Sequence, residues 1–164
     1  MEERKDLLRE LKEFPMLQNL PDHDLECLAG LMKEEIFEEG SRIIEEGAIG
    51  DNMYLLLKGT VDVLKTTLYG DEYVCATLKD ELHCVFGEMA LIDHDRRSAT
   101  VTAKTICRTL SITAADFQKY CRDYPRVGCE LLHFIAVNLC RNLRKENENL
   151  LKVYQTLLEE IEAM

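Results

Sequence analysis

The sequence lacks any hydrophobic run long enough to cross a membrane. Its longest uninterrupted apolar stretch, residues 53–57, has five residues, whereas a helix that spans a bilayer needs about 20. Residues 1–6 are almost all charged and so lack the apolar centre of a secretory signal peptide. We therefore expect a cytoplasmic protein with no membrane association.

Basic side chains are also scarce. The 164 residues include 20 lysines and arginines against 31 aspartates and glutamates, which gives a net charge of −11. Nucleic-acid surfaces depend on concentrated basic side chains that face the phosphates, so this balance argues against a nucleic-acid partner. It leaves room for a local pocket that binds one small anion, because net charge says nothing about a single buried arginine.

Clustered metal ligands are missing as well. The seven cysteines show no C-x-x-C spacing and the four histidines are isolated, whereas a zinc site needs ligands close together. We expect reduced, mostly buried thiols and no metal. A cupin-type metalloenzyme would need several histidines, and His83 and His94 do not form such a set. No side chain has the base and orienting partner that catalysis requires, so we expect no enzymatic activity.

The sequence does contain a clear change of hydrophobic period. Residues 4–13 have the spacing of a short amphipathic helix, and a second helix is predicted after Pro21. Over residues 35–113 the period becomes two, with turn residues every eight to twelve positions. The predicted strands include residues 42–45, 53–57, 60–65, 73–78 and 107–112. Many short, evenly spaced strands favour a β-sandwich or jelly-roll barrel over a parallel sheet.

The C-terminal part is predicted to be helical. Thr113 and Asp116 resemble a capping box for a short helix over 117–124 that ends before Pro125. Over residues 126–163 there is no proline, and Gly128 is the one glycine. These residues predict a single helix about 57 Å long.

This long helix carries a heptad pattern that predicts a homodimer. Position d is occupied by Ala136, Leu143, Leu150, Leu157 and Met164, and position a by Cys140, Asn147, Tyr154 and Ile161. A single Asn at position a, here Asn147, sets the register in parallel dimers. The alternative is an amphipathic helix that lies on its own barrel.

Residues 86–103 carry the chemistry. The alternation after Arg96 predicts one strand face with four side chains: Arg97, Ala99, Val101 and Ala103. A guanidinium on such an apolar face is costly unless it is paired, whereas Arg96 is expected to be solvated. Arg97 therefore needs an anion, which is either Glu88 in an internal salt bridge or the phosphate of a ligand.

The residues around Glu88 favour the phosphate. Gly87 allows a close backbone approach, and residues 89–92 predict a helical turn whose first N–H groups attract anions. Small Ala90 and Ala99 leave room, and an arginine fork that faces such a turn is a phosphate clamp. Because phosphate repels a carboxylate, Glu88 is left to accept a hydrogen bond from a sugar hydroxyl. Phosphate and ribose hydroxyl together indicate a compact nucleotide.

The segment resembles the phosphate-binding cassette of the cyclic nucleotide-binding domain family, of the catabolite activator protein and kinase regulatory subunit type. The family pattern F-G-E-x-A-L, a loop, then R-[AST]-A-x-V matches residues 86–91 and 97–101. A glycine-rich signature upstream matches over residues 40–63. The resemblance covers roughly residues 14–145.

The resemblance implies an α+β, mainly β fold. It predicts an eight-stranded jelly-roll-like β-barrel over residues 35–113, with the cassette at 86–101. An N-terminal helical segment (1–34) precedes the barrel and C-terminal helices (114–164) follow it, as one domain overall. A transcription factor of this family would need about 50 further residues of helix-turn-helix, so we expect no DNA-binding domain.

The resemblance also implies a ligand, a 3′,5′-cyclic mononucleotide. Glu88 would bind the ribose 2′-hydroxyl and Arg97 the cyclic phosphate. The expected ligand-binding residues are Phe86, Gly87, Glu88, Met89, Ala90, Arg97, Ser98 and Ala99. Alternation points the Ser98 side chain away from the ligand, but the family pattern brings it to the phosphate, and we follow the family. We expect cAMP rather than cGMP, because Ser98 stands where a threonine often accompanies guanine preference.

Two further expectations concern the link before the cassette and the long helix after it. Residues 78–86 are about two residues longer than the family's link and lack its glycine, so Cys84 and Val85 are expected beside the base, with a core position as the alternative for Cys84. The polar run within residues 141–149 is expected to act as a hinge that lets the part of the helix beyond it cover the base.

The alternative function is a dimeric scaffold of the same fold with a non-functional pocket, which the intact Glu88 and Arg97 argue against.

Overall fold

The computed structural model describes residues 2–162. The chain divides into two compact units, one that ends at Gly128 and one that begins at Cys129. The elements of the first unit are α1 (Glu2–Leu11), α2 (Asp22–Ala29), β1 (Lys33–Phe37), β2 (Arg42–Ile44), β3 (Asn52–Lys58), β4 (Thr60–Thr66), β5 (Glu72–Lys79), the 3₁₀ helix η1 (Asp80–Leu82), β6 (Val85–Phe86), the 3₁₀ helix η2 (Glu88–Leu91), β7 (Thr100–Ala103), β8 (Cys107–Thr113) and α3 (Ala114–Asp123). Helix α4 (Pro125–Glu162) starts in this unit and makes up the second.

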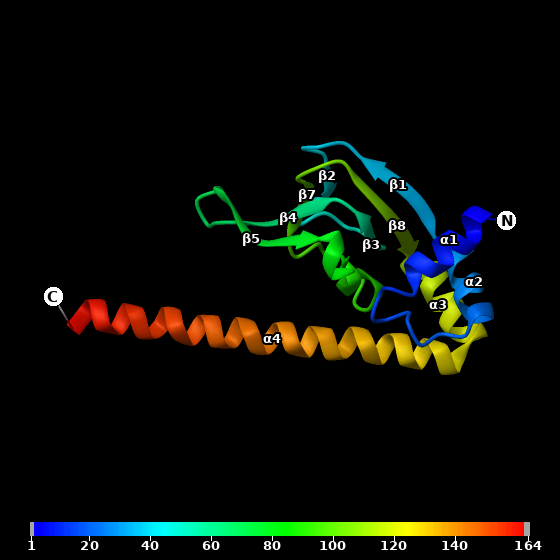
Figure 1. Ribbon diagram of the computed structural model, residues 1–164. Helices are drawn as coiled ribbons and strands as arrows, with labels where there is room; N and C mark the ends of the chain where they lie inside the picture. Colours follow the sequence, from blue (N-terminus) through cyan, green and yellow to red (C-terminus); the bar gives the residue numbers. More distant parts are fainter. Residues whose placement is uncertain (1, 163–164) are drawn as a thin grey trace. The chain divides into compact units, whose positions relative to one another are not determined.

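The eight strands form two four-stranded antiparallel sheets (Figure 1). One sheet has the order β1-β8-β3-β6 and the other β2-β7-β4-β5. Most neighbours are distant in the chain, which is the connectivity of a jelly roll. The jelly-roll fold expected from the sequence is confirmed, and each strand predicted from the alternation agrees with the structure to within a residue at either end.

The core lies between the two sheets. Both sheets contribute to one buried cluster of side chains: Ile44, Tyr54, Leu56, Val61, Phe86, Val101, Ala103 and Cys107. The spacing of two between Tyr54 and Leu56, and between Val101 and Ala103, places these side chains on the inner faces of β3 and β7. Burial of apolar side chains such as Leu56 stabilises the fold by about 1.5–3 kcal/mol each.

The helices of the first unit build a second buried region. Eight side chains of these helices and of the turn after α1 are at most 2% exposed: Leu11, Phe14, Leu17, Leu25, Leu28, Ala114, Phe117 and Tyr120. The Tyr120 hydroxyl donates to the carbonyl of Asp24, 2.9 Å away, and so joins α3 to α2. Thr113 caps α3 as predicted, because its hydroxyl accepts from the Asp116 N–H at 3.1 Å.

The long link into the cassette has a structure of its own. It contains η1, which is followed by His83, and the φ of His83 (45°) lies in the left-handed region. His83 therefore takes the conformation that a glycine usually supplies, and its ring packs edge-on against Phe14 with 5.6 Å between centroids. Asp80 fixes the turn, since its carboxylate accepts from the Gly59 N–H at 2.8 Å.

Helix α4 runs without a break through its 38 residues. Pro125 is its first residue, a position at which the missing N–H costs nothing. In its first turn Gly128 lies against Cys121 of α3, where a Cβ would come within 2.7 Å of the Cys121 Cα. The expected hinge at 141–149 has no counterpart in a helix break and stays a prediction.

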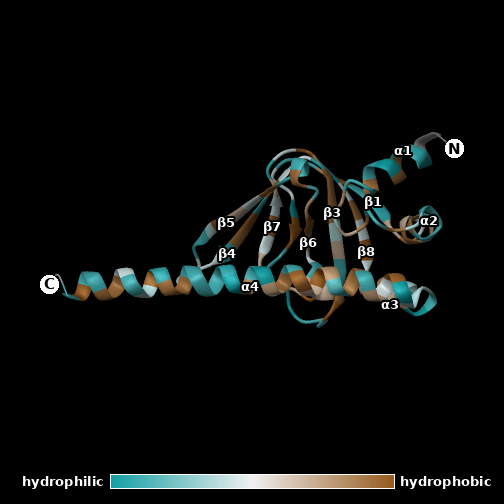
Figure 2. Cartoon of the chain, turned by 60° about the horizontal axis from the view of Figure 1, so that its bottom comes forward, coloured by the Kyte–Doolittle hydropathy of each residue, from teal (hydrophilic) through white to brown (hydrophobic). Residues whose placement is uncertain are grey.

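The second unit exposes the predicted heptad positions. Among them Leu143, Leu150, Tyr154, Leu157 and Ile161 are each more than half exposed, while Met164 lies outside the described residues. Figure 2 shows hydrophobic residues recurring along α4 as far as its outer turns. The apolar stripe is therefore exposed along the described part of α4.

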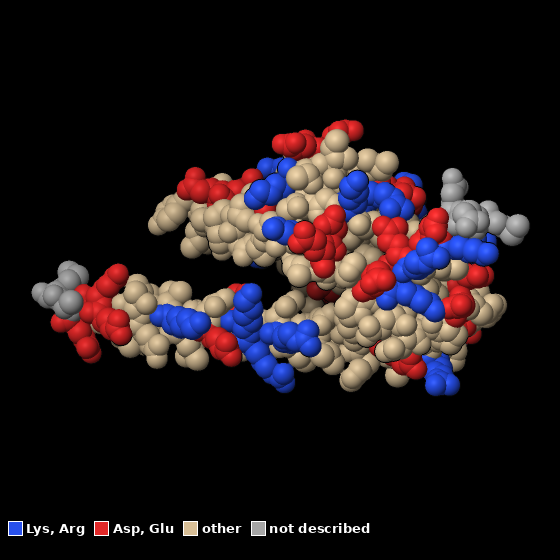
Figure 3. Space-filling view, in the orientation of Figure 1, with Lys and Arg blue, Asp and Glu red and all other residues tan. Residues whose placement is uncertain are grey.

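Charged side chains of both signs are interspersed over the barrel face in Figure 3. Basic side chains gather midway along α4, and acidic ones lie towards its C-terminal end. Within residues 2–162 no helix is both long and apolar enough to cross a membrane.

The expectation that most cysteines are buried is wrong for three of the seven. Cys75 lies on the edge strand β5, Cys129 and Cys140 lie on α4, and all three are exposed. Only Cys107 is fully buried. An apolar sequence context around a thiol does not show which face of a strand or helix the thiol occupies.

Candidate ligand-binding site

The cassette begins where β6 turns into η2. Gly87 makes this turn with a φ of 75°, a conformation that other residues rarely adopt. A Cβ at Gly87 would lie 2.9 Å from Nη1 of Arg97 and 3.0 Å from the carbonyl oxygen of Asn52. The close backbone approach expected at Gly87 is therefore present, and the predicted helical turn is the 3₁₀ helix η2.

The guanidinium of Arg97 is fixed by main-chain carbonyls. Its Nη2 donates to the Asn52 carbonyl at 2.8 Å, and its Nη1 donates to the Gly87 carbonyl at 3.2 Å. On its other side lies Gly50, where a Cβ would come within 2.2 Å of the Arg97 Nε. Two glycine backbones thus leave a slot whose width fits a planar guanidinium.

The main chain of Arg97 is also fixed. Its N–H donates to the Ala48 carbonyl, and its carbonyl accepts from the Gly47 N–H, both at 2.9 Å. The loop between β2 and β3 therefore holds the backbone of Arg97 through residues 47 and 48, and packs against the side chain at Gly50.

The salt bridge between Arg97 and Glu88, one of the two arrangements that the sequence allowed, does not form. Among the side chains of residues 4–162, no carboxylate makes an ion pair with Arg97. Burial lowers the pKa of this half-buried guanidinium, and the nearby Tyr54 and Asp51 act in the opposite direction. The group stays protonated at neutral pH, so the slot holds a positive charge without a bonded counter-charge.

Glu88 is half-buried as the first residue of η2. Within the described chain its carboxylate makes no hydrogen bond or ion pair with another residue. Burial raises its pKa above the usual value for a glutamate, because removal from water disfavours the charged form. A carboxylate in this state gains from any hydroxyl donor brought to it.

The other expected site residues divide into two groups. Phe86 and Ala90 are buried, and Phe86 stacks on Tyr54 with 5.2 Å between ring centroids, so their side chains support the cassette from the core. Met89 is 43% exposed and Ser98 is exposed as well, with Oγ 3.7 Å from the Met89 sulfur. Ala99 is half-buried.

Arg96 is exposed, as expected, and its Nη1 also donates to the Gly47 carbonyl at 2.8 Å. The main-chain N–H of Ala90 donates to the Gly87 carbonyl at 3.3 Å, so this amide already has a partner within the turn. Cys84 is half-buried, and burial raises its pKa.

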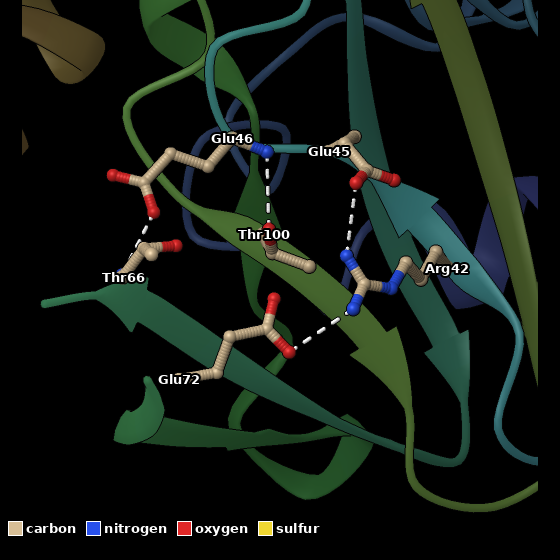
Figure 4. Close-up of polar contacts among 6 residues, drawn as sticks. All are labelled: Arg42, Glu45, Glu46, Thr66, Glu72 and Thr100. Carbon is tan, nitrogen blue, oxygen red and sulfur yellow. Dashed lines mark hydrogen bonds and ion pairs between the residues drawn. The ribbon is translucent and has the colours of Figure 1, made fainter. Parts of the chain in front are cut away.

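A polar framework next to the cassette holds the start of the β2–β3 loop, the loop that contacts Arg97 (Figure 4). The main-chain N–H of Glu46 donates to the Thr100 hydroxyl at 3.0 Å, and its carboxylate accepts from the Thr66 N–H at 2.9 Å. The Thr66 hydrogen bond, with help from Lys65, lowers the pKa of Glu46. Lys65 in turn donates to the Ser98 carbonyl. The start of the β2–β3 loop, β4 and residues 98–100 are thereby joined.

A second part of this framework joins β2 to the edge strand β5. Arg42 bonds Glu45 at 2.9 Å and Glu72 at 3.0 Å (Figure 4). The pairing of Arg42 with Glu72, like that of Arg97 with the carbonyl of Asn52, could not be found from the sequence, because contacts across 30 or more positions depend on strand order. The glycine signature around Gly50 was the one available signal.

The fold and the site together define a class of protein, a jelly-roll domain with a preformed cationic slot. Comparison with known proteins gives the family: residues 34–124 match the cyclic nucleotide-binding domain. The chain belongs to the cyclic nucleotide-binding domain family, a family of non-catalytic regulatory modules.

The relatives include kinase subunits and bacterial regulators. The cAMP-dependent protein kinase regulatory subunit of Yarrowia lipolytica is 38% identical over 109 residues, which are 66% of this chain and 28% of that protein. The catabolite activator protein of Thermus thermophilus superposes with a TM-score of 0.73 at 27% identity, over 83% of this chain and 61% of that one. The Toxoplasma gondii PKA regulatory domain, crystallised with cAMP, gives a TM-score of 0.64 at 26% identity, over 72% of this chain and 44% of that one.

Proposed function

We propose that this chain is a cyclic nucleotide sensor that binds a 3′,5′-cyclic mononucleotide, with a preference for cAMP. The observation that carries the proposal is the half-buried guanidinium of Arg97, fixed by two carbonyls and not neutralised by a carboxylate. Its family includes a cAMP-dependent kinase subunit and a regulatory domain crystallised with cAMP.

The phosphate would bind to Arg97. A guanidinium has five N–H donors, and two of those on Arg97 have carbonyl partners, so three are left for a ligand. Charge-assisted bonds from a fixed fork to phosphate oxygens are among the strong hydrogen bonds of proteins. The main chain of Gly87 and Met89 would complete the cradle.

The ribose would bind to Glu88. Its carboxylate bonds no other residue of the described chain, and burial disfavours its charged form. A 2′-hydroxyl would supply the missing donor. Phosphate and ribose contacts together would select a cyclic nucleotide over an unsubstituted phosphate. The preference for adenine is supported by the family resemblance at Ser98.

The signal would leave through α4. Its exposed stripe around Leu150 and Leu157 has the heptad spacing of a coiled coil, which supports a homodimer. Ligand binding would shift the position of the helix around residues 141–149, because a ligand that contacts two arrangements differently changes their populations.

Calorimetric titration with cAMP, cGMP and cyclic dinucleotides tests the proposal. The parent chain should bind cAMP, and Arg97→Ala should weaken binding at least about 100-fold, since each charged hydrogen bond contributes about 1.5–3 kcal/mol. Arg97→Lys should restore binding only in part, because a point charge does not replace a fork.

Arg96→Ala is the matched control, because it removes the same charge from the neighbouring residue, and we expect it to change affinity less than about threefold. Circular dichroism should show all variants folded. If Arg97→Ala binds cAMP as tightly as the parent, Arg97 is not the phosphate ligand. Tenfold tighter binding of cGMP, about 1.4 kcal/mol, would overturn the adenine preference.

A further inference from the structure

A cavity of about 350 Å³ lies among α1, α2 and α3, and none of its lining residues belongs to the cassette. Its lining includes Cys27 of α2 and Tyr124, the residue that directly follows α3. The proposed nucleotide site uses none of these residues. The cavity therefore calls for a separate explanation.

Cys27 lies between a base and a hydroxyl donor. His23 precedes it by one helical turn, and the His23 Nε2 is 3.9 Å from the Cys27 sulfur. The Tyr124 hydroxyl donates to the same sulfur at 3.1 Å, and the His23 ring meets Tyr124 edge-on with 6.4 Å between centroids. The imidazole can take the thiol proton while the phenol stabilises the thiolate that remains.

The other four thiols of the first unit lack this arrangement. Cys75 and Cys107 donate to main-chain carbonyls at 3.2–3.3 Å, which favours the protonated form. Burial raises the pKa of Cys84 and of Cys121. Cys27 is the one whose sulfur accepts a hydrogen bond from a hydroxyl and also lines the cavity.

Charges of both signs line the cavity. Arg4 and Lys119 supply positive charge, whereas Glu26 and Asp123 supply negative charge. A purely anionic or purely cationic ligand would be repelled by half of this lining. A small peptide with free carboxylates and a free ammonium group matches it.

We propose that Cys27 is a modification site for a zwitterionic peptide disulfide of the glutathione disulfide class. His23 takes the proton from the thiol, and the Cys27 thiolate attacks one sulfur of the disulfide. The new protein–peptide S–S bond forms as the original S–S bond breaks, and the other peptide leaves as a thiolate that takes up the proton. The disulfide is reduced to one free thiol, and Cys27 is oxidised to the mixed disulfide.

The modification would change how α2 meets α3. A sulfur in a mixed disulfide no longer offers the thiolate acceptor for Tyr124, and the added peptide fills the cavity between the helices. The hydrogen bond from the Tyr120 hydroxyl to the Asp24 carbonyl would then be left to join α3 to α2.

The test treats the reduced full chain with glutathione disulfide at neutral pH and follows each cysteine by peptide mass spectrometry. Cys27 should gain the peptide at least about tenfold faster than Cys75, although Cys75 is the more exposed thiol. Tyr124→Phe and His23→Gln should slow Cys27 several-fold and leave Cys75 unchanged, while His133→Gln, a matched histidine substitution on α4, should have no effect.

Iodoacetamide, which is uncharged, separates thiolate reactivity from ligand recruitment. Lys119→Gln should slow the reaction of Cys27 with glutathione disulfide but not with iodoacetamide. Circular dichroism checks that each variant is folded. The proposal is overturned if Cys27 reacts no faster than Cys75 with glutathione disulfide, or if both Tyr124→Phe and His23→Gln leave its rate unchanged.

Discussion

The slot around Arg97 depends on the absence of a side chain at Gly50. A Cβ there would lie 2.2 Å from the Arg97 Nε, so Gly50→Ala must displace the guanidinium. Because φ of Gly50 is not in the left-handed region, the effect is steric. We expect a loss of about 1–3 kcal/mol in the free energy of unfolding together with a large loss of cAMP affinity, measured by urea unfolding and calorimetry.

Gly30→Ala is the control for this prediction. Gly30 has ordinary helical dihedrals, and an added Cβ would meet only carbonyl oxygens at 3.4 Å. Its stability should change by less than about 1 kcal/mol, with cAMP affinity unchanged. Parent-like cAMP binding by Gly50→Ala would show that the position of the guanidinium does not matter.

Glu88 makes the stability of the unliganded protein depend on pH. Burial raises its folded-state pKa, so the ionised form costs stability at neutral pH, and stability rises as pH falls through that raised pKa. Glu88→Gln should therefore be more stable than the parent at neutral pH. The difference should vanish in acid, below the unfolded pKa, as followed by urea unfolding at several pH values.

The same residue can be tested with ligands. If Glu88 binds the ribose, 2′-deoxy-cAMP should bind the parent more weakly by about 1–3 kcal/mol, and Glu88→Gln should discriminate less between the two ligands. Equal affinities of the parent for cAMP and 2′-deoxy-cAMP would remove Glu88 from the ribose site.

At this scale the sequence indicated the charged residues but not their partners. Alternation and motif spacing singled out Arg97, Glu88 and Gly87, because chemistry of that kind needs fixed residue types. Any residue can supply a main-chain carbonyl, so the hydrogen bond from Arg97 to the Asn52 carbonyl could not be predicted from the sequence.

At the scale of elements, hydrophobic period predicted the long strands and the three-residue β2, but missed β6. Strands β3, β4 and β8 each have seven residues, enough for alternation to be seen. Strand β6 has two, and η1 depends on His83 in a left-handed conformation, which no period reveals. Tertiary packing rather than local propensity decides such short pieces.

Helix α4 allows a direct test of the dimer. Leu150 and Leu157 are 68% and 51% exposed, so replacing both by Glu should turn a dimer into a monomer by adding like charges to the seam. Asn149→Glu with Thr156→Glu adds the same charge at positions c of the heptad and should leave the dimer intact. Sedimentation velocity measures both, and a monomeric parent would contradict the proposal.

At the scale of the whole molecule, the question is whether the ligand affects more than the cassette. Hydrogen exchange with and without cAMP should show greater protection over residues 86–98 and altered exchange over 141–155. The first follows from new bonds at the cassette and the second from a shift of α4. A change confined to 86–98 would leave a binding module without a relay.

The guanidinium of Arg97 is held by hydrogen bonds to main-chain carbonyls, and this has a consequence for the choice of buffer. Since no ion pair has to break before a ligand enters, small tetrahedral oxyanions should bind in the slot as counterions. Inorganic phosphate and sulfate should then compete with the nucleotide, each lowering its apparent affinity in proportion to concentration, whereas the same ionic strength of chloride should do so less. The unliganded domain would thus rarely be vacant in a phosphate-rich solution, and the nucleotide would arrive by exchange.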